Sequence, residues 1–323
     1  MKYDRLNEIK HSIDIRSSRK VISLLNGMSK SIYMGRSMDF DDLRDYVIGD
    51  NSSDIDWKSS IRHGSLLVRR YEAYKRHNVL FLVDSGIKFN GYASPEYKKS
   101  DLAMHCYGTL AYLAYKKEDD AAFISNIDGG IKFSKFRSNL YDLEANLSEV
   151  EKNITKKNQY NVNDLLMYAI NNTRKRMVIF IISDIDGLVK LDMKLVSKAC
   201  ARHNLVFLNI EDISIFGTDR FDLEVSKNVP RIIARSKAIR EIERKEKQNI
   251  IDTKTKELKR YKVSVGHISN KEEIVDKLID LLERHKNAVG TRAWGTISLF
   301  DNWGNTSNIT CFNTTCIYNI QIN

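Results

Sequence analysis

Val79 to Lys88, which read VLFLVDSGIK, decide the fold that we predict for this chain. The first five residues are apolar without alternation, which is typical of a strand covered on both faces. Such strands occur in parallel sheets, because helices cover both sides of those sheets. The run ends at Asp84, so we predict a carboxylate at the carboxyl end of a central strand, where doubly wound sheets place their ligand crevice.

A second buried strand and several amphipathic helices continue the pattern. Met177 to Ile182 read MVIFII and are followed by Ser183 and Asp184, so the two buried strands end alike. Further strands are predicted at 121–127, 131–136, 205–210 and 263–268, and helices at 97–117, 140–150, 164–172, 191–202, 237–261 and 271–285. This alternation indicates an α/β fold with a doubly wound, mostly parallel sheet, of the Rossmann-like kind.

The composition divides the 323 residues into three segments. We predict an N-terminal helix-and-strand extension at 1–78, the α/β domain at 79–290, and an atypical tail at 291–323. The tail carries only Arg292 and Asp301 as charges but two of the three tryptophans. We interpret it either as an extra hairpin or as a disordered or non-native extension.

Several classes of protein are disfavoured by simple counts. No run approaches the roughly 18 apolar residues of a membrane span, and the first residues lack the apolar core of a signal peptide. We therefore predict a cytoplasmic protein. The four cysteines lack metal-ligand spacing, which indicates reduced thiols. Cys106 and Cys200 lie in apolar helical patterns and are predicted core residues.

The formal charge of +10 makes nucleic acid a partner to consider. The segment from Arg231 to Arg260 contains eleven basic residues and five acidic ones. No aromatic side chain interleaves them to stack on bases, so a solvated helix face or a protein-docking surface is the preferred interpretation. Nucleic-acid binding through this segment remains the alternative function.

A dense polar stretch lies before the central strand, between Ser31 and Gly86. Its notable residues, in order, are Gly35, Asp39, Phe40, Arg44, Tyr46, Gly49, Asp50, Ile55, Asp56, Trp57, Arg62 and the Val68-Arg69-Arg70 strand. This series resembles the signature of the "domain of unknown function 58" family, which precedes a von Willebrand factor A-like domain, and the resemblance extends to about residue 288. Ser37, Ser53 and Ile61 depart from the family pattern.

The resemblance implies a bacterial, non-enzymatic protein-interaction adaptor that partners a MoxR-type AAA+ ATPase, with an unknown client protein. The residues themselves agree with the absence of catalysis. The sequence shows no nucleophile elbow, phosphate loop or zinc-spaced Cys/His set, so we name no catalytic residue.

The signature also has a physical interpretation. Arg44 and Arg62 offer forked donors, and Asp50 and Asp56 can accept from them or from turn amides, which makes a buried polar scaffold tolerable. Trp57 is expected to anchor this scaffold through its apolar area. A partner-docking face is the other interpretation of the same residues.

A second alternative function is enzymatic. Asp54, Asp56 and Lys58 alternate, and on a strand they would project to one face and could hold a divalent ion, as in a metal-dependent nuclease.

Von Willebrand A-like domains usually carry a metal-ion-dependent adhesion site, built from Asp-x-Ser-x-Ser, a threonine and a later aspartate, which suits magnesium. The resemblance matches Asp84 to the first aspartate and Asp184 to the later one. It places Gly86 and Lys88 at the two serine positions. Near the threonine it places Asn163 or Asp164.

The lysine decides how we interpret this site. An ammonium beside two aspartates would repel a divalent ion, so we predict that Lys88 replaces the metal and that no cofactor is bound. In the alternative, Lys88 points into solvent and Ser85 joins Asp84 and Asp184 around weakly bound magnesium. The predicted partner-binding crevice, which would meet an acidic side chain of the partner through Lys88, consists of Asp84, Ser85, Gly86, Lys88, Asn163, Asp164, Asp184 and Asp186.

Overall fold

A computed structural model describes most of the chain. The described residues are 4–13, 15–32, 39–72, 76–127, 129–154, 160–212, 221–222, 227–228, 237–290, 294–300, 306–312 and 315–318. The chain divides into two compact units, one formed by residues 33–77 and the other by the remainder. Each unit is described by itself.

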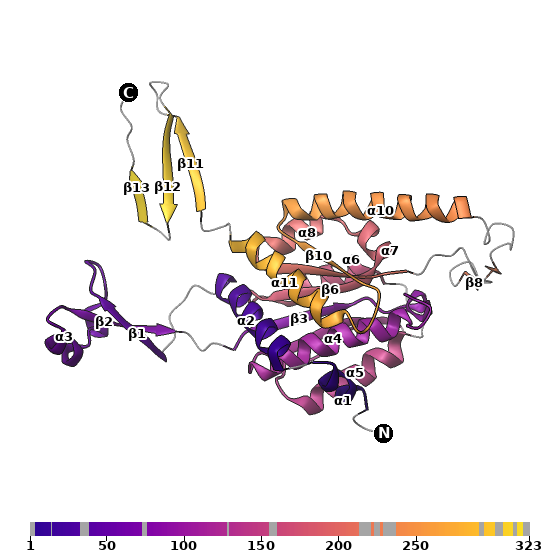
Figure 1. Ribbon diagram of the computed structural model, residues 1–323, viewed down its shortest axis with the longest axis horizontal. Helices are drawn as coiled ribbons and strands as arrows, with labels where there is room; N and C mark the ends of the chain where they lie inside the picture. The colour runs from indigo at the N-terminus through magenta and orange to yellow at the C-terminus, as the bar shows by residue number, and fades with distance from the viewer. Residues whose placement is uncertain are drawn as a thin grey trace. The chain divides into compact units, whose positions relative to one another are not determined.

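The main unit is built on a six-stranded sheet (Figure 1). Its strands are β3 (Asn78–Val83), β4 (Asp120–Ile127), β5 (Gly130–Phe133), β6 (Val178–Asp184), β7 (Asn204–Ile210) and β10 (Ser264–Ile268). The order is β10-β7-β6-β3-β4-β5, with β5 antiparallel at one edge and the other five parallel. This arrangement confirms the predicted doubly wound, mostly parallel α/β class.

Helices cover both faces of this sheet (Figure 1). On one side lie α1 (Asp4–Ser12), α2 (Ile15–Ile32), α4 (Lys99–Lys116), α5 (Leu140–Ile154) and α11 (Ile274–Gly290). On the other lie α6 (Val162–Asn172), α7 (Ile185–Lys190), α8 (Met193–Cys200) and α10 (Lys237–Arg260). The helices α1 and α2 pack against α4 and α11, so they belong to the main unit.

The apolar run of β3 is buried on both sides, as its sequence predicts. Leu80 and Leu82 contribute to the core that the sheet shares with α6 and α8. Phe81 points to the opposite face, where its ring packs edge-on against Tyr107 of α4 at 5.1 Å between centroids. Val79 to Val83 are all at most 1% exposed. Cys106 and Cys200 are buried free thiols, which confirms the prediction for both.

The small unit is an antiparallel hairpin with a helical insertion. Strand β1 (Asp39–Asp45) pairs with β2 (Leu67–Glu72), with a bulge between Phe40 and Asp42. The 3-10 helix η1 (Ser52–Asp54) and the helix α3 (Trp57–His63) lie between the strands in sequence. Ile55, Leu67 and Val68 are its buried apolar residues among those described.

Short strands complete the described elements. The pair β8 (Phe221–Asp222) and β9 (Lys227–Asn228) is antiparallel. In the tail, β11 (Trp294–Phe300), β12 (Thr306–Phe312) and β13 (Thr315–Tyr318) form an antiparallel sheet. Across the described ranges, no helix combines the length and apolar character that crossing a membrane requires.

Candidate functional site

Three neighbouring parallel strands deliver aspartates to one edge of the sheet. Asp84 follows β3 directly, Asp184 is the last residue of β6, and Asp212 lies two residues beyond β7. The Asp84 amide donates to the Ile182 carbonyl at 2.9 Å, which fixes the end of β3 against β6. The carboxyl ends of these strands therefore bring the three acids together.

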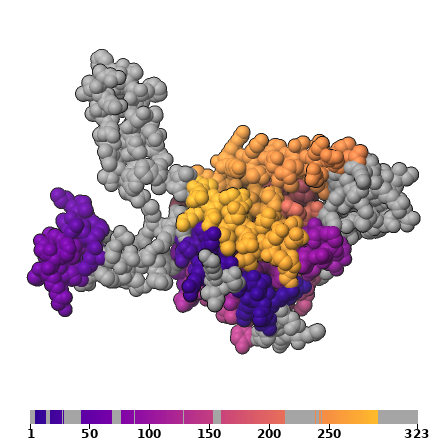
Figure 2. Space-filling model, in the orientation of Figure 1, coloured from indigo at the N-terminus to yellow at the C-terminus, as the bar shows by residue number. Residues whose placement is uncertain are grey.

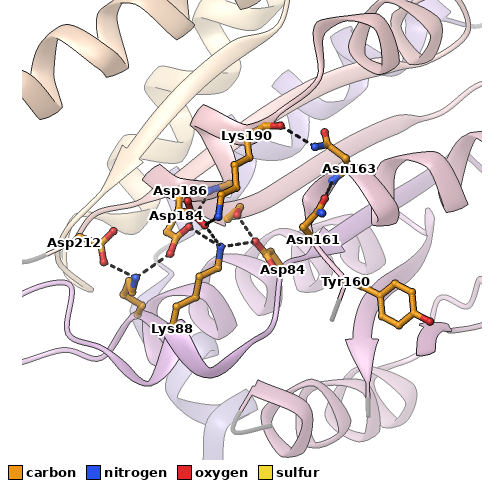
Figure 3. A network of polar contacts seen from close by, with 12 residues as sticks. Asp84, Lys88, Tyr160, Asn161, Asn163, Asp184, Asp186, Lys190 and Asp212 are labelled. Atoms are coloured by element: carbon orange, nitrogen blue, oxygen red, sulfur yellow. Dashed lines mark hydrogen bonds and ion pairs between the residues drawn. The ribbon is translucent and has the colours of Figure 1, made fainter. Parts of the chain in front are cut away.

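Lys88 lies at the centre of a ring of carboxylates (Figure 3). It belongs to the 3-10 helix η2 (Ile87–Asn90). Its Nζ atom lies 3.3 Å from Asp84 Oδ2, 3.1 Å from Asp184 Oδ1 and 3.2 Å from Asp186 Oδ2. An ammonium has three N–H donors, so three carboxylates can use all of them. Lys88 thus points into the site and not into solvent.

The spacing of the ring suits an ammonium. A magnesium ion needs ligand oxygens at about 2.0–2.1 Å, whereas the carboxylate oxygens lie 3.1–3.3 Å from the Lys88 nitrogen. In the described part of the chain, no group of three or more His, Cys, Asp or Glu residues has the spacing to hold a metal ion.

A second lysine, which sequence reasoning missed, lies deeper in the site. Lys99, the first residue of α4, is 4% exposed. Its Nζ atom lies 2.9 Å from Asp184 Oδ2, pairs with Asp212, and lies 5.7 Å from the centre of the Phe89 ring. Asp212 could have been found by the rule that located the other aspartates, because it too follows a buried strand.

Neutral side chains hold Asp84 in place. Ser183 donates its hydroxyl to Asp84 Oδ2 at 2.6 Å, and Asn126 Nδ2 lies 3.3 Å from Asp84 Oδ1. The Ser85 hydroxyl donates to the Asn126 carbonyl at 2.9 Å, so in this structure it braces β4. Sequence reasoning missed Ser183 and Asn126. The sequence did hold a signal for Ser183, because this polar residue directly follows an apolar run.

Burial and charge shift the pKa values of the site in opposite directions. Burial, together with the nearby Asp184, raises the pKa of Asp84, and the attraction of Lys88 does not outweigh these effects. Burial also opposes ionisation of Asp184, but Lys99 and Lys88 outweigh it and lower the pKa of this carboxyl. For both lysines, burial disfavours the charge, yet the surrounding carboxylates raise the pKa. Both ammonium groups are therefore charged at neutral pH.

The rim of the site is formed by Asp186 and the α6–α7 region (Figure 3). Lys190 Nζ lies 2.9 Å from Asp186 Oδ2. Asn163, which the resemblance places near the threonine position, donates to the Lys190 carbonyl at 2.7 Å. Asp164 is used in the capping box of α6, where it accepts from the Asn161 amide.

Gly86 has open space where a side chain would begin. Its φ of −173° is extended backbone that any residue adopts, and a Cβ atom built there meets nothing within 4 Å. The glycine at this serine position is therefore not required by the backbone.

The structure describes most of the family signature, in the small unit. Arg44 pairs with Asp50 through two contacts of 2.8 and 2.6 Å, as predicted, and Gly49 takes a positive φ of 106° in the turn between them. Gly35 lies outside the described residues, Asp39 and Phe40 lie in β1, and Tyr46 follows that strand.

Other parts of the predicted scaffold are wrong. Trp57 is 60% exposed and anchors no core, and Arg62 is exposed as well. Asp56 accepts from the Ser59 amide at 3.0 Å as the N-cap of α3, and a backbone amide was one of the two kinds of donor predicted for it. Trp57 and Arg62 belong to a short surface helix, whereas the prediction placed them in a buried cluster.

The alternating arrangement proposed for a nuclease does not exist either. Asp54 ends η1, Asp56 caps α3, and Lys58 lies within α3. Because a helix turns about 100° per residue, these side chains do not share a face as they would on a strand.

The basic segment is a surface helix where it is described. Residues 231–236 lie outside the described ranges, and α10 runs along the surface of the main unit (Figure 2). Leu258 is its only buried residue among those whose burial is described. Acidic residues interleave with the basic ones, for example Glu241 and Lys245 at 3.7 Å.

The fold and the edge of the sheet define an α/β domain with a cluster of carboxylates and two lysines at the ends of its central strands, where the cleft was predicted. A comparison with protein families then identifies the family to which this domain belongs. Residues 42–214 match the family described as "Protein of unknown function DUF58", and the chain belongs to that family. A comparison with curated proteins found no sequence match.

Solved structures with a similar fold include three of low sequence identity. An aerotolerance-related membrane protein from Bacteroides fragilis is 11% identical, with a TM-score of 0.41, over 64% of this chain and 99% of that one. The conserved hypothetical protein BatB from Bacteroides thetaiotaomicron is 12% identical, with a TM-score of 0.42, over 65% and 99%. A von Willebrand factor type A protein from Catenulispora acidiphila is 8% identical, with a TM-score of 0.35, over 72% and 46%.

Proposed function

We propose that the chain is a cytoplasmic, non-enzymatic adaptor that binds a MoxR-type AAA+ ATPase and presents a client protein to it. Its cleft is a degenerate adhesion site in which Lys88 replaces the metal ion. Membership of the DUF58 family supports this proposal. The observation that carries it is the Lys88 ammonium, which lies within 3.3 Å of three carboxylates at the ends of the central strands.

The geometry supports a specific way of binding an acidic partner. All three donors of Lys88 face the chain's own carboxylates, so a partner carboxylate must displace one of them. Asp186 is the exchangeable one, because its side chain is 36% exposed, whereas those of Asp84 and Asp184 are 3% and 2% exposed. Lys190 lies 2.9 Å from Asp186 and would retain it after the exchange.

The test measures binding of a purified MoxR-type ATPase from the same host, with and without ATP. We expect Lys88→Met to weaken binding about tenfold or more, since a desolvated charge pair is lost. Asp186→Asn should bind at least as tightly as the original chain, because the competing carboxylate is gone. Lys198→Met is the matched control, since it removes an exposed ammonium of α8 that takes no part in the proposed exchange.

Two outcomes would contradict the proposal. One is failure of the ATPase to bind in either nucleotide state. The other is micromolar binding of magnesium or manganese in isothermal titration, abolished by Asp84→Ala.

A further inference from the structure

Large apolar side chains stand exposed in the small unit formed by residues 33–77. The exposed fractions are 61% for Val47, 96% for Ile48, 60% for Trp57, 82% for Ile61 and 45% for Leu66. Scattered exposed apolar residues are ordinary, but a contiguous group marks an interaction site. These five residues therefore indicate an interaction site only if they lie close together in the hairpin.

Backbone contacts place the turn residues at one end of the hairpin. Asp45 pairs with Leu67 at the end of the β1–β2 ladder, and the Tyr46 amide donates to the Leu66 carbonyl at 2.8 Å. The turn that carries Val47 and Ile48 therefore adjoins Leu66.

Helix α3 lies at the same end. The Asp56 amide, just before α3, donates to the Leu67 carbonyl at 2.9 Å. Gly64, the C-cap of the helix, lies two residues before Leu66. Trp57 and Ile61 are four residues apart, so they share one face of α3. All five apolar side chains thus belong to one end of the unit.

A basic stripe borders the apolar stripe of α3. Lys58 and Arg62 are exposed and also four residues apart, on the face next to Trp57 and Ile61. Among the described residues, no carboxylate forms an ion pair with either of them. The surface therefore offers apolar area together with two cations that have no carboxylate partner in the described part of this unit.

We propose that this face of α3, consisting of Trp57, Lys58, Ile61 and Arg62, is a docking surface for an acidic amphipathic helix of a partner protein. The partner's apolar side chains would cover Trp57 and Ile61, and its carboxylates would pair with Lys58 and Arg62. This surface is formed by other residues than the site around Lys88, and the proposal holds whether or not that site binds a partner.

Charge favours this occupant over others. A symmetric contact between two copies would bring the same stripes of Lys58 and Arg62 together, which repels. An anionic membrane or a nucleic acid would attract α3 but would be repelled by Asp45 and Asp54, which lie before and after the exposed turn. A partner protein can place its carboxylates opposite α3 alone.

The test titrates the full chain into two labelled synthetic helical peptides, one of Leu and Glu and one of Leu and Lys, and follows fluorescence anisotropy. We expect the Leu/Glu peptide to bind. Trp57→Ala should weaken it by roughly tenfold or more, as expected for a central aromatic contact. The double variant Lys58→Glu/Arg62→Glu should weaken it about tenfold and gain affinity for the Leu/Lys peptide.

The matched control is Lys259→Glu/Arg260→Glu, which makes the same change of net charge on exposed residues of α10. It should leave peptide binding within about twofold of the original. Circular dichroism checks that each variant is folded.

Four results would overturn the proposal. The first is an equal effect of the control and the α3 variant. The second is tighter binding to phosphatidylserine vesicles than to the Leu/Glu peptide. The third is a dimer in sedimentation velocity that Trp57→Ala abolishes. The fourth is strong hydrogen-exchange protection of residues 57–63 in the free chain, which would mean that the rest of the chain covers them.

Discussion

Lys99 Nζ lies 2.9 Å from Asp184 Oδ2, and the two side chains are only 6% and 2% exposed. This contact joins the start of α4 to the end of β6, and through Asp212 it reaches the end of β7. Taking charges out of water is costly, and the cost is offset only while both partners remain. The cleft therefore depends on a cation that does not face solvent.

Replacing Lys99 should destabilise the chain strongly. We expect Lys99→Ala to lower the free energy of unfolding by about 3–5 kcal/mol, because it leaves Asp184 and Asp212 without their buried partner. Lys98→Ala, the exposed neighbour, should cost less than about 0.5 kcal/mol. Urea denaturation measures both. Equal stabilities of the two variants would show that the buried ion pair is not needed.

Removing Lys88 should convert the cleft into a cation site. Lys88→Ala leaves Asp84, Asp184 and Asp186 facing a space without positive charge, so we expect lower stability and a rise in Tm on adding millimolar magnesium. The original chain should show no such rise, because its ammonium occupies the position. Thermal unfolding with and without magnesium measures both effects, with Lys190→Ala as the control. A Lys88→Ala variant whose Tm does not rise on adding magnesium would contradict this prediction.

Two glycines near the cleft should tolerate substitution very differently. A Cβ on Gly187 would overlap with the Ser183 hydroxyl and lie 3.3 Å from Asp84 Oδ2. We expect Gly187→Ala to cost about 1–3 kcal/mol, since Ser183 must leave Asp84. Gly86→Ala should be nearly neutral, because its position is open and extended. Adding Ser183→Gly to Gly187→Ala should recover part of the loss in denaturant unfolding.

The buried His105 should make stability fall in mild acid. It is 5% exposed, and burial, assisted by Lys271, lowers its pKa to about 4 from 6.5. Between pH 6.5 and 4 the unfolded chain binds a proton that the folded chain does not, so stability decreases as the pH falls. The loss is at most about 3.5 kcal/mol, at about 1.4 kcal/mol for each pKa unit.

Urea denaturation at pH 7.5 and 4.5 measures this dependence. Replacing the histidine by His105→Gln should reduce the difference between the two pH values. His203, whose pKa burial also lowers to about 4, should account for part of the remainder. An unchanged difference between the two pH values in His105→Gln would contradict the assignment.

Sequence patterns located the elements whose apolar composition indicates that they are buried. The strands β3 and β6 were found because short, unbroken apolar stretches are typical of a strand covered on both faces. Their terminal aspartates were found because they stand at the ends of these stretches. Strand β1 was not predicted, because five of its seven residues are charged and only pairing with β2 makes it a strand. The helix α3 was also not predicted, since Asp56 was interpreted as a residue of the family signature and not as the cap of a helix.

The cleft was predictable only in part. Asp84, Lys88 and Asp184 stand at positions that the family resemblance marks. The pair of Lys99 and Asp184 is separated by 85 positions, and nothing near Lys99 in the sequence indicates a buried partner. Charged residues are almost never fully buried unless paired, so a buried lysine is recognised only when its partners are known in space.

Under the proposed function, Lys88 is a counter-ion that is synthesised with the chain, so every folded molecule would carry it in a one-to-one ratio. Partner binding would then need no step of metal loading, and we expect it to be insensitive to chelators. The fraction of the chain in complex would depend on how much of the chain and of its proposed partner the cell makes, and not on the supply of free divalent cations.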